Sequence, residues 1–169
     1  MKERNTQIVK ISEISSDLLE ELVNAKVIEF IPTADVIFIP DKTFANDNSV
    51  QWMFPEGTES FFDFLKKSEH HDLGTVDIAE GNTGELQQHH DLLELATIII
   101  TTPSFDVLVN LISNYIYDFL KIKRKHADEV DVKLKIVRKE KSTTTSIEFK
   151  GSAADFKMVM DSVNDKKHK

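Results

Sequence analysis

Apolar residues recur with helical spacing from residue 105 to residue 120. The segment FDVLVNLISNYIYDFLKIKRK has an apolar residue at every third or fourth position, which predicts a long amphipathic helix. Ser104 can accept hydrogen bonds as its N-cap, and the basic residues at 121–125 suit the negative end of the helix dipole. The apolar side comprises Phe105, Leu108, Val109, Ile112, Tyr115, Ile116, Phe119 and Leu120.

A strict alternation follows in VDVKLKIV, residues 130–137. Val130, Val132, Leu134 and Ile136 share one face, which predicts a half-buried antiparallel strand. KEKST is expected to turn, and TTSIEFK returns as a second strand that ends at Gly151. Its inward residues are Ile147 and Phe149.

The last apolar pattern predicts a closing helix. Ser152 stands three residues before Asp155, a spacing similar to a capping box. Phe156, Val159, Met160 and Val163 then follow at helical spacing.

Short β-branched and aromatic runs predict strands in the first part of the chain. QIVKI (7–11), TVDIA (75–79) and ATIIITT (96–102) are three of them, and the last reads as a buried strand that ends before Pro103. VIEFI (27–31) and DVIFI (35–39) each end in Ile-Pro and are separated by three residues. We expect these two runs to form a strand pair.

Three helices are expected among these strands. DLLEELVNA (17–25) has Ser15 or Ser16 as N-cap, and ESFFDFLKK (59–67) has Thr58 or Ser60. Residues 85–95 also follow a helical pattern, whereas 41–49 is rich in turn-forming residues.

These elements together predict an α+β fold. Residues 1–103 form an acidic region with a mixed sheet and helices, and residues 104–169 form a helix-strand-strand-helix unit. We expect the helix at 104–122 to bridge the two parts. The pattern leaves open whether the parts form one domain or two.

Charge divides the chain at about the same place. Residues 1–103 hold 7 Lys and Arg against 19 Asp and Glu, whereas residues 104–169 hold 14 against 10. The total of -8 argues against a general nucleic-acid binder. The basic stretch KIKRKH (121–126) is short and lies at a helix end, where complementing the dipole explains it better than phosphate binding.

Composition excludes several chemistries. The chain has no cysteine, so it forms neither disulfides nor thiolate metal sites, and this agrees with a reducing, cytoplasmic location. We expect no membrane span, because the longest aliphatic run is Ile98 to Ile100. Phosphate-binding glycine loops and the G-x-S-x-G motif of serine hydrolases are absent, so no cofactor is predicted.

The tetrapeptide HHDL occurs twice. His70, His71 and Asp72 stand in the first copy, and His89, His90 and Asp91 stand in the second. Imidazole and carboxylate groups are good ligands for zinc, manganese or iron, and the two His-Asp doublets are similar to those of HD phosphohydrolases. The resemblance implies metal-dependent hydrolysis of phosphate esters.

A polar surface is the simpler interpretation of these histidines. Neighbouring residues of a helix point about 100° apart, so a doublet directs at most one imidazole towards a shared ion. The first copy also lies in an expected loop beside Gly74, whereas the core of that family is helical.

A second candidate site is the aromatic stretch Trp52, Met53 and Phe54. These residues either belong to the core, where large aromatic side chains usually lie, or line a groove for a partner protein.

The last third of the chain resembles a family of small bacterial proteins. VNLISNYIYDFLKIKRK, VDVKLKIV, SIEFKG and SAADFKMVM are similar in pattern to the effector-associated constant components of bacterial conflict and signalling systems. The resemblance covers residues 104 to about 165 and is carried by apolar patterns alone. It implies a non-enzymatic adaptor or scaffold role, and it transfers no catalytic residue.

Three functions follow as hypotheses. The first is a cytoplasmic interaction module of a prokaryotic multi-protein system, with a protein partner encoded nearby and with self-association left open. The second is the metal-dependent phosphohydrolase. The third is an acidic inhibitor of a nucleic-acid enzyme, suggested by the negative charge of residues 1–103.

Overall fold

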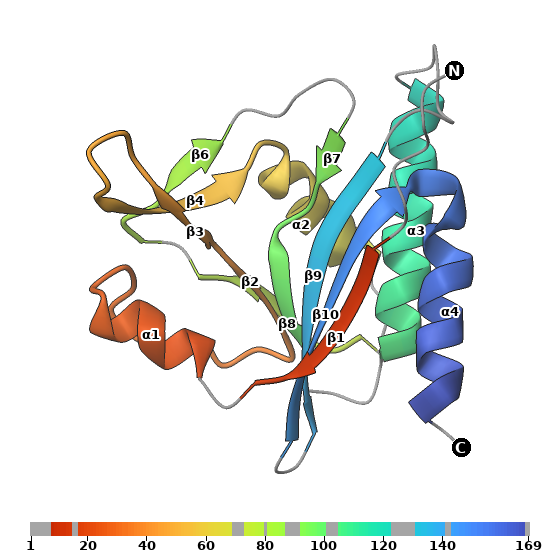
Figure 1. Cartoon of the computed structure of the whole chain (residues 1–169), viewed down its shortest axis with the longest axis horizontal. Coiled ribbons are helices and arrows are strands. Elements are labelled where there is room, and N and C mark those ends of the chain that lie inside the picture. Colours follow the sequence, from red (N-terminus) through yellow and green to blue (C-terminus); the bar gives the residue numbers. More distant parts are fainter. Residues whose placement is uncertain are drawn as a thin grey trace.

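The structure, a computed structural model, describes residues 8–14, 17–68, 73–79, 81–86, 92–100, 105–122, 131–140 and 143–167 (Figure 1). Helices and strands alternate irregularly along these ranges, and the strands form mixed sheets. The predicted α+β class is therefore confirmed.

A seven-stranded sheet forms the centre of the fold. Its order is β1-β10-β9-β8-β2-β5, and β7 pairs with β9 beside β8. The hairpin of β9 and β10 lies between β1 and β8, so one sheet joins strands from both parts of the sequence. The strands are β1 (Ile8–Glu13), β2 (Val36–Ile39), β5 (Val76–Ile78), β7 (Leu92–Glu94), β8 (Thr97–Ile100), β9 (Asp131–Glu140) and β10 (Thr143–Ser152).

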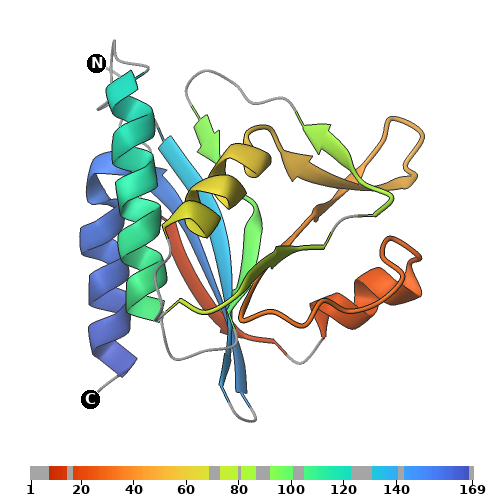
Figure 2. The same ribbon diagram turned by 180° about the vertical axis from the view of Figure 1, so that it is seen from behind.

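Three helices cover one face of this sheet (Figures 1 and 2). They are α2 (Thr58–Lys67), α3 (Phe105–Ile122) and α4 (Phe156–Lys167), the last preceded by the 3-10 turn η2 (Ala153–Asp155). The rings of Phe61 in α2 and Tyr115 in α3 lie 4.9 Å apart. The short helix α1 (Leu18–Asn24) packs on the opposite face.

Alternate side chains of the central strands belong to two separate hydrophobic cores, one on each face of the sheet. Val36 and Phe38 of β2 belong to the core under α2 and α3, whereas Ile37 and Ile39 belong to the core under α1. Successive side chains of a strand point to opposite faces, so these wholly buried strands read as unbroken apolar runs.

A second sheet has the order β3-β4-β6. Its strands are β3 (Asp41–Phe44), β4 (Val50–Pro55) and β6 (Gly84–Leu86). Strand β3 follows β2 directly after Pro40, whose missing amide hydrogen cannot extend the ladder. The chain leaves the large sheet there, and the β3–β4 hairpin extends away from α3 and α4 (upper left in Figure 1).

Most predicted elements are present. The runs at 7–11, 35–39, 75–79 and 96–102 overlap β1, β2, β5 and β8, and the predicted helices at 17–25, 59–67 and 104–122 overlap α1, α2 and α3. The hairpin and the closing helix are also confirmed, and Ser152 donates a hydrogen bond of 2.9 Å to Asp155. Strand β9 is antiparallel to β10 as predicted, but it is parallel to β7 and β8 on its other side.

Two predicted elements are wrong. Residues 27–31 form no strand, and the neighbours of β2 are β5 and β8. The described residues of 85–95 form no helix: β6 and β7 lie at the two ends of this range, and 87–91 lie outside the described residues. Both segments are short, so their local pattern is a weak guide to their structure. In the second segment, the two ends are strands because β6 pairs in parallel with β4 and β7 pairs in parallel with β9.

The helix starts differ in detail. Asp17 is the N-cap of α1 and accepts hydrogen bonds from the amides of Leu19 and Glu20. Gly57, with φ of 85°, precedes α2. Ser15, Ser16 and Ser104 lie outside the described residues. Within the ranges that the structure describes, every helix is too short or too polar to cross a bilayer.

Candidate functional site

Both predicted His-His-Asp clusters fall in segments that the structure does not describe. His70, His71, Asp72, His89, His90 and Asp91 all lie outside the described residues. Among the residues that the structure describes, histidine and acidic side chains form no group of three or more suited to a metal ion.

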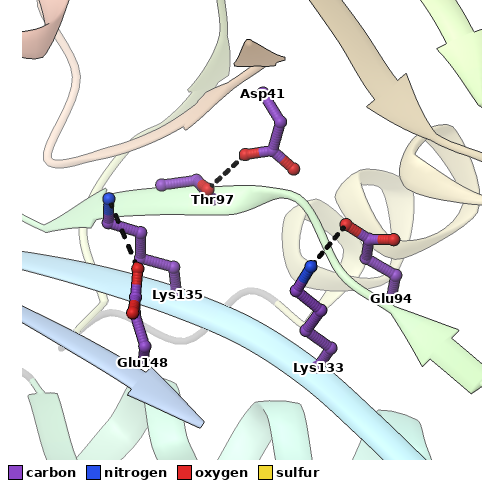
Figure 3. Close-up of polar contacts among 6 residues, drawn as sticks. All are labelled: Asp41, Glu94, Thr97, Lys133, Lys135 and Glu148. Carbon is purple, nitrogen blue, oxygen red and sulfur yellow. Dashed lines mark hydrogen bonds and ion pairs between the residues drawn. The ribbon is translucent and has the colours of Figure 1, made fainter. Parts of the chain in front are cut away.

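A polar cluster lies beside β8, where the chain passes from β2 in the large sheet to β3 in the second sheet (Figure 3). Asp41 is the first residue of β3, and its carboxylate accepts a hydrogen bond of 2.7 Å from the hydroxyl of Thr97 in β8. The pairing of β2 with β8 ends at Ile39, which is the partner of Thr97, and Asp41 follows two residues later. The cluster therefore occupies the fork between the two sheets.

Two ion pairs continue this cluster across the large sheet. Lys133 of β9 lies 3.9 Å from Glu94 of β7, and Lys135 lies 3.8 Å from Glu148 of β10. Lys133 and Lys135 alternate with the buried Leu134 on β9, so they share the face that α1 covers only in part.

Burial perturbs both carboxylates near the fork. Loss of water raises the pKa of Asp41 above its ordinary value, while the Thr97 hydrogen bond and the charges of Lys133 and Lys135 oppose the rise. Burial also raises the pKa of Glu94; Lys133 opposes this rise, and the negative charge of Asp41 adds to it. The two carboxylates are thus electrostatically linked.

This arrangement is better suited to joining the two sheets at this point than to catalysis. Thr97 supplies the hydroxyl group of the cluster, but the residue is only 4% exposed and its hydroxyl already donates to Asp41. The two lysines are each paired with a glutamate. A substrate would have to displace these contacts before it could reach either group.

The predicted aromatic site is divided by the structure. Trp52, Met53 and Phe54 all belong to β4, but Phe54 is 8% exposed and lies in the core beneath α2 and α3. Trp52 is half-buried against the core under α1, and Met53 lies against Gly84. The three residues do not form one open groove.

An exposed apolar pair lies further along the same hairpin. Phe44 and Val50 are cross-strand partners, and they are 67% and 47% exposed. Lys42 and Trp52 are the next pair on that face of the hairpin. Lys42 lies 5.9 Å from the centre of the Trp52 ring and 3.7 Å from the carboxylate of Glu21 in α1. The hairpin thus contacts α1 through Lys42, and it exposes Phe44 and Val50 further towards its tip.

The turn of this hairpin is well defined. Ala45 donates a backbone hydrogen bond to Ser49, and Asn48 donates one to Ala45 with φ of 66° at Asn48. The carboxylate of Asp47 accepts hydrogen bonds from the amide and the hydroxyl of Ser49. The hydroxyl bond, followed by the amide bond, lowers the pKa of Asp47. The tip therefore holds Phe44 and Val50 in fixed positions.

Sequence reasoning missed both features of this region. The alternation in VDVKLKIV puts its two lysines on the face opposite Leu134, but Asp41 and Glu94 come from segments predicted to be a turn and a helix. Phe44 lay in the expected turn, so nothing indicated that it would face Val50 across a hairpin.

Comparison with models of protein families, with curated proteins and with solved structures found no match. The resemblance of residues 104–165 to effector-associated constant components therefore stays a prediction.

Proposed function

We propose that this chain is a non-enzymatic interaction module, an adaptor that binds a protein partner through the β3–β4 hairpin. The exposed Phe44–Val50 pair is the observation that carries the proposal. We further propose that it works in the cytoplasm as part of a prokaryotic multi-protein system of the conflict or defence type, beside a partner encoded nearby.

Energetics support an apolar anchor at this hairpin. Complete burial of a large apolar side chain contributes about 1.5–3 kcal/mol, so two adjacent ones can dominate a small interface. The ordered turn at 45–49 already fixes their backbone. Less conformational entropy is then lost on binding.

The type of system is proposed from the C-terminal unit. Helix α3, the β9–β10 hairpin and α4 have the order of elements in the effector-associated components that residues 104–165 resemble. The lack of cysteine agrees with a reducing compartment.

The proposal is tested by co-expression with the products of neighbouring genes. Any complex is then purified, and its affinity is measured by titration calorimetry. Phe44→Thr with Val50→Thr removes the apolar pair while keeping strand-forming residues at both positions. We expect this double variant to bind at least about ten-fold more weakly, since that loss corresponds to only about 1.4 kcal/mol.

A matched variant lies on the other face of the same strands. Thr43 and Gln51 are also cross-strand partners, and Thr43→Ser with Gln51→Thr should leave the affinity unchanged. The proposal fails if no neighbouring product binds, or if both double variants weaken binding equally.

A further inference from the structure

A segment with strand-like sequence lies unpaired beside an open sheet edge. Residues 27–31, VIEFI, are anchored mainly through Val27, which donates to the carbonyl of Leu22 and accepts from the amide of Asn82, both at 2.9 Å. Val27 and Ile28 are buried, whereas Phe30 and Ile31 are 76% and 41% exposed. The second half of the segment thus exposes apolar side chains, although its backbone belongs to no sheet.

Strand β5 is the nearby edge. It is parallel to β2, and among the described residues no strand pairs with its other side. Thr75 accepts from Val36 and Ala79 donates to Phe38, so alternate residues bond to β2. In a parallel ladder the residues between them, Val76 and Ile78, direct their backbone groups outward.

The outward amide of Ile78 has only a local acceptor. It donates a hydrogen bond of 2.8 Å to the side chain of Asp77, the preceding residue. A carboxylate on an exposed side chain can move away, so this donor can be taken over by a backbone carbonyl without breaking the β2 ladder.

A pocket of about 720 Å³ lies between the segment and the edge. Val27, Ile28 and Phe30 line one wall, and Asp77 and Ile78 line the other. Its size falls within the roughly 300–1000 Å³ of known ligand pockets. Gly81 bounds it where its backbone touches the carbonyl of Val27 so closely that a side chain would not fit.

The charges at this pocket favour a basic occupant. Among the described residues that line it, Glu29 and Asp77 are acidic and Lys26 is the one basic residue, and the whole chain carries a net charge of -8. An extended segment with alternating apolar and basic residues would place apolar side chains against Phe30 and Ile28 and a cation near the two carboxylates.

We propose that the groove between residues 28–31 and β5 binds an extended, basic segment of a partner protein, which adds a strand to the edge of the large sheet. The main-chain hydrogen bonds would come from Val76 and Ile78, and the pocket would select the side chains. This site is separate from the Phe44–Val50 pair in its residues, and it would give an adaptor a second place of contact.

The test uses the full chain and the fluorescein-labelled peptide Thr-Val-Arg-Val-Thr-Val-Arg, followed by fluorescence anisotropy. Controls are the same peptide with glutamate in place of arginine, and the arginine peptide with N-methyl groups on alternate amides. We expect saturable binding of the arginine peptide alone, because the first control reverses the charge and the second removes main-chain donors.

Protein variants locate the binding. Ile78→Pro removes the outward amide but leaves the bonds to β2, and proline is tolerated at such edge positions. It should weaken binding at least about ten-fold, whereas Ile78→Val should not. Glu29→Lys changes an exposed side chain and should also weaken binding, which keeps the test decisive if the proline variant does not fold.

Three results would overturn the proposal. The first is no binding of the arginine peptide up to about millimolar concentration. The second is equal binding of all three peptides, or unchanged binding by Ile78→Pro and Glu29→Lys. The third is a dimer of the protein alone that Ile78→Pro makes monomeric, which would identify a second copy as the occupant. The Phe44→Thr/Val50→Thr variant should bind the peptide normally, so the two proposals can fail separately.

Discussion

The hydroxyl of Thr97 donates a hydrogen bond of 2.7 Å to the carboxylate of Asp41, and this contact joins β8 to β3 at the point where the chain leaves the large sheet. Thr97 is buried and Asp41 is the first residue after the Pro40 break. The two sheets are thus connected by a side-chain bond where the backbone ladder ends.

Replacement of Thr97 by valine should destabilise the protein. The change keeps the shape of the side chain but leaves a largely buried carboxylate without its donor, which costs about 1–3 kcal/mol. Urea unfolding followed by circular dichroism measures this loss. Thr97→Ser keeps the hydroxyl and should cost less; equal losses in the two variants would show that the hydrogen bond contributes nothing.

The pH dependence of stability should change in Asp41→Asn. The folded-state pKa of Asp41 is raised above its ordinary value of 3.8, so its favourable contribution is complete below that pH and is lost as the pH rises through the folded pKa. Asparagine cannot ionise and can still accept from Thr97. We therefore expect the variant to gain stability relative to the natural chain as the pH rises, measured by urea unfolding across the acidic range.

Asp47→Asn provides a control of opposite sign. The bonds from Ser49 lower the pKa of Asp47, so its contribution is present above 3.8 and is lost as the pH falls through the folded pKa. This variant should lose stability relative to the natural chain as the pH rises. A parallel response of the two variants would contradict the assigned directions.

Gly81→Ala should push apart the two backbone segments that touch beside the proposed groove, at Gly81 and Val27. An added Cβ would overlap the carbonyl of Val27, which accepts from the amide of Asn82. We expect a loss of about 1–3 kcal/mol and faster hydrogen exchange at the Asn82 amide. Gly57→Ala meets no atom within 4 Å but has φ of 85°, so it should cost roughly 1–2 kcal/mol and leave the Asn82 amide protected.

Metal analysis tests the alternative function. If the chain is an adaptor, elemental analysis of freshly purified protein should find no stoichiometric zinc, manganese or iron. A transition metal at one equivalent that is lost on His90→Ala would instead favour the phosphohydrolase hypothesis, because imidazole is a common ligand for these ions.

Local pattern determined much of this fold. The alternation in β9, the spacing in α3 and the apolar run of β8 each predicted the correct element, because a period of two or 3.6 residues arises within one segment. The errors at 27–31 and 85–95 show the limit of this reasoning. Both stretches are apolar enough for regular structure, but the first has only Val27 and Ile28 buried and the second is divided between two sheets.

By itself, the sequence determined the α+β class, the C-terminal helix-hairpin-helix order and the inward-facing residues of the β9–β10 hairpin. Only the tertiary structure decided that β9 and β10 lie in the middle of the large sheet, that Asp41 meets Thr97, and that Phe44 and Val50 face solvent together. The physical reason is that strand pairing and burial depend on segments distant in the chain, whose choice of partner no local period records.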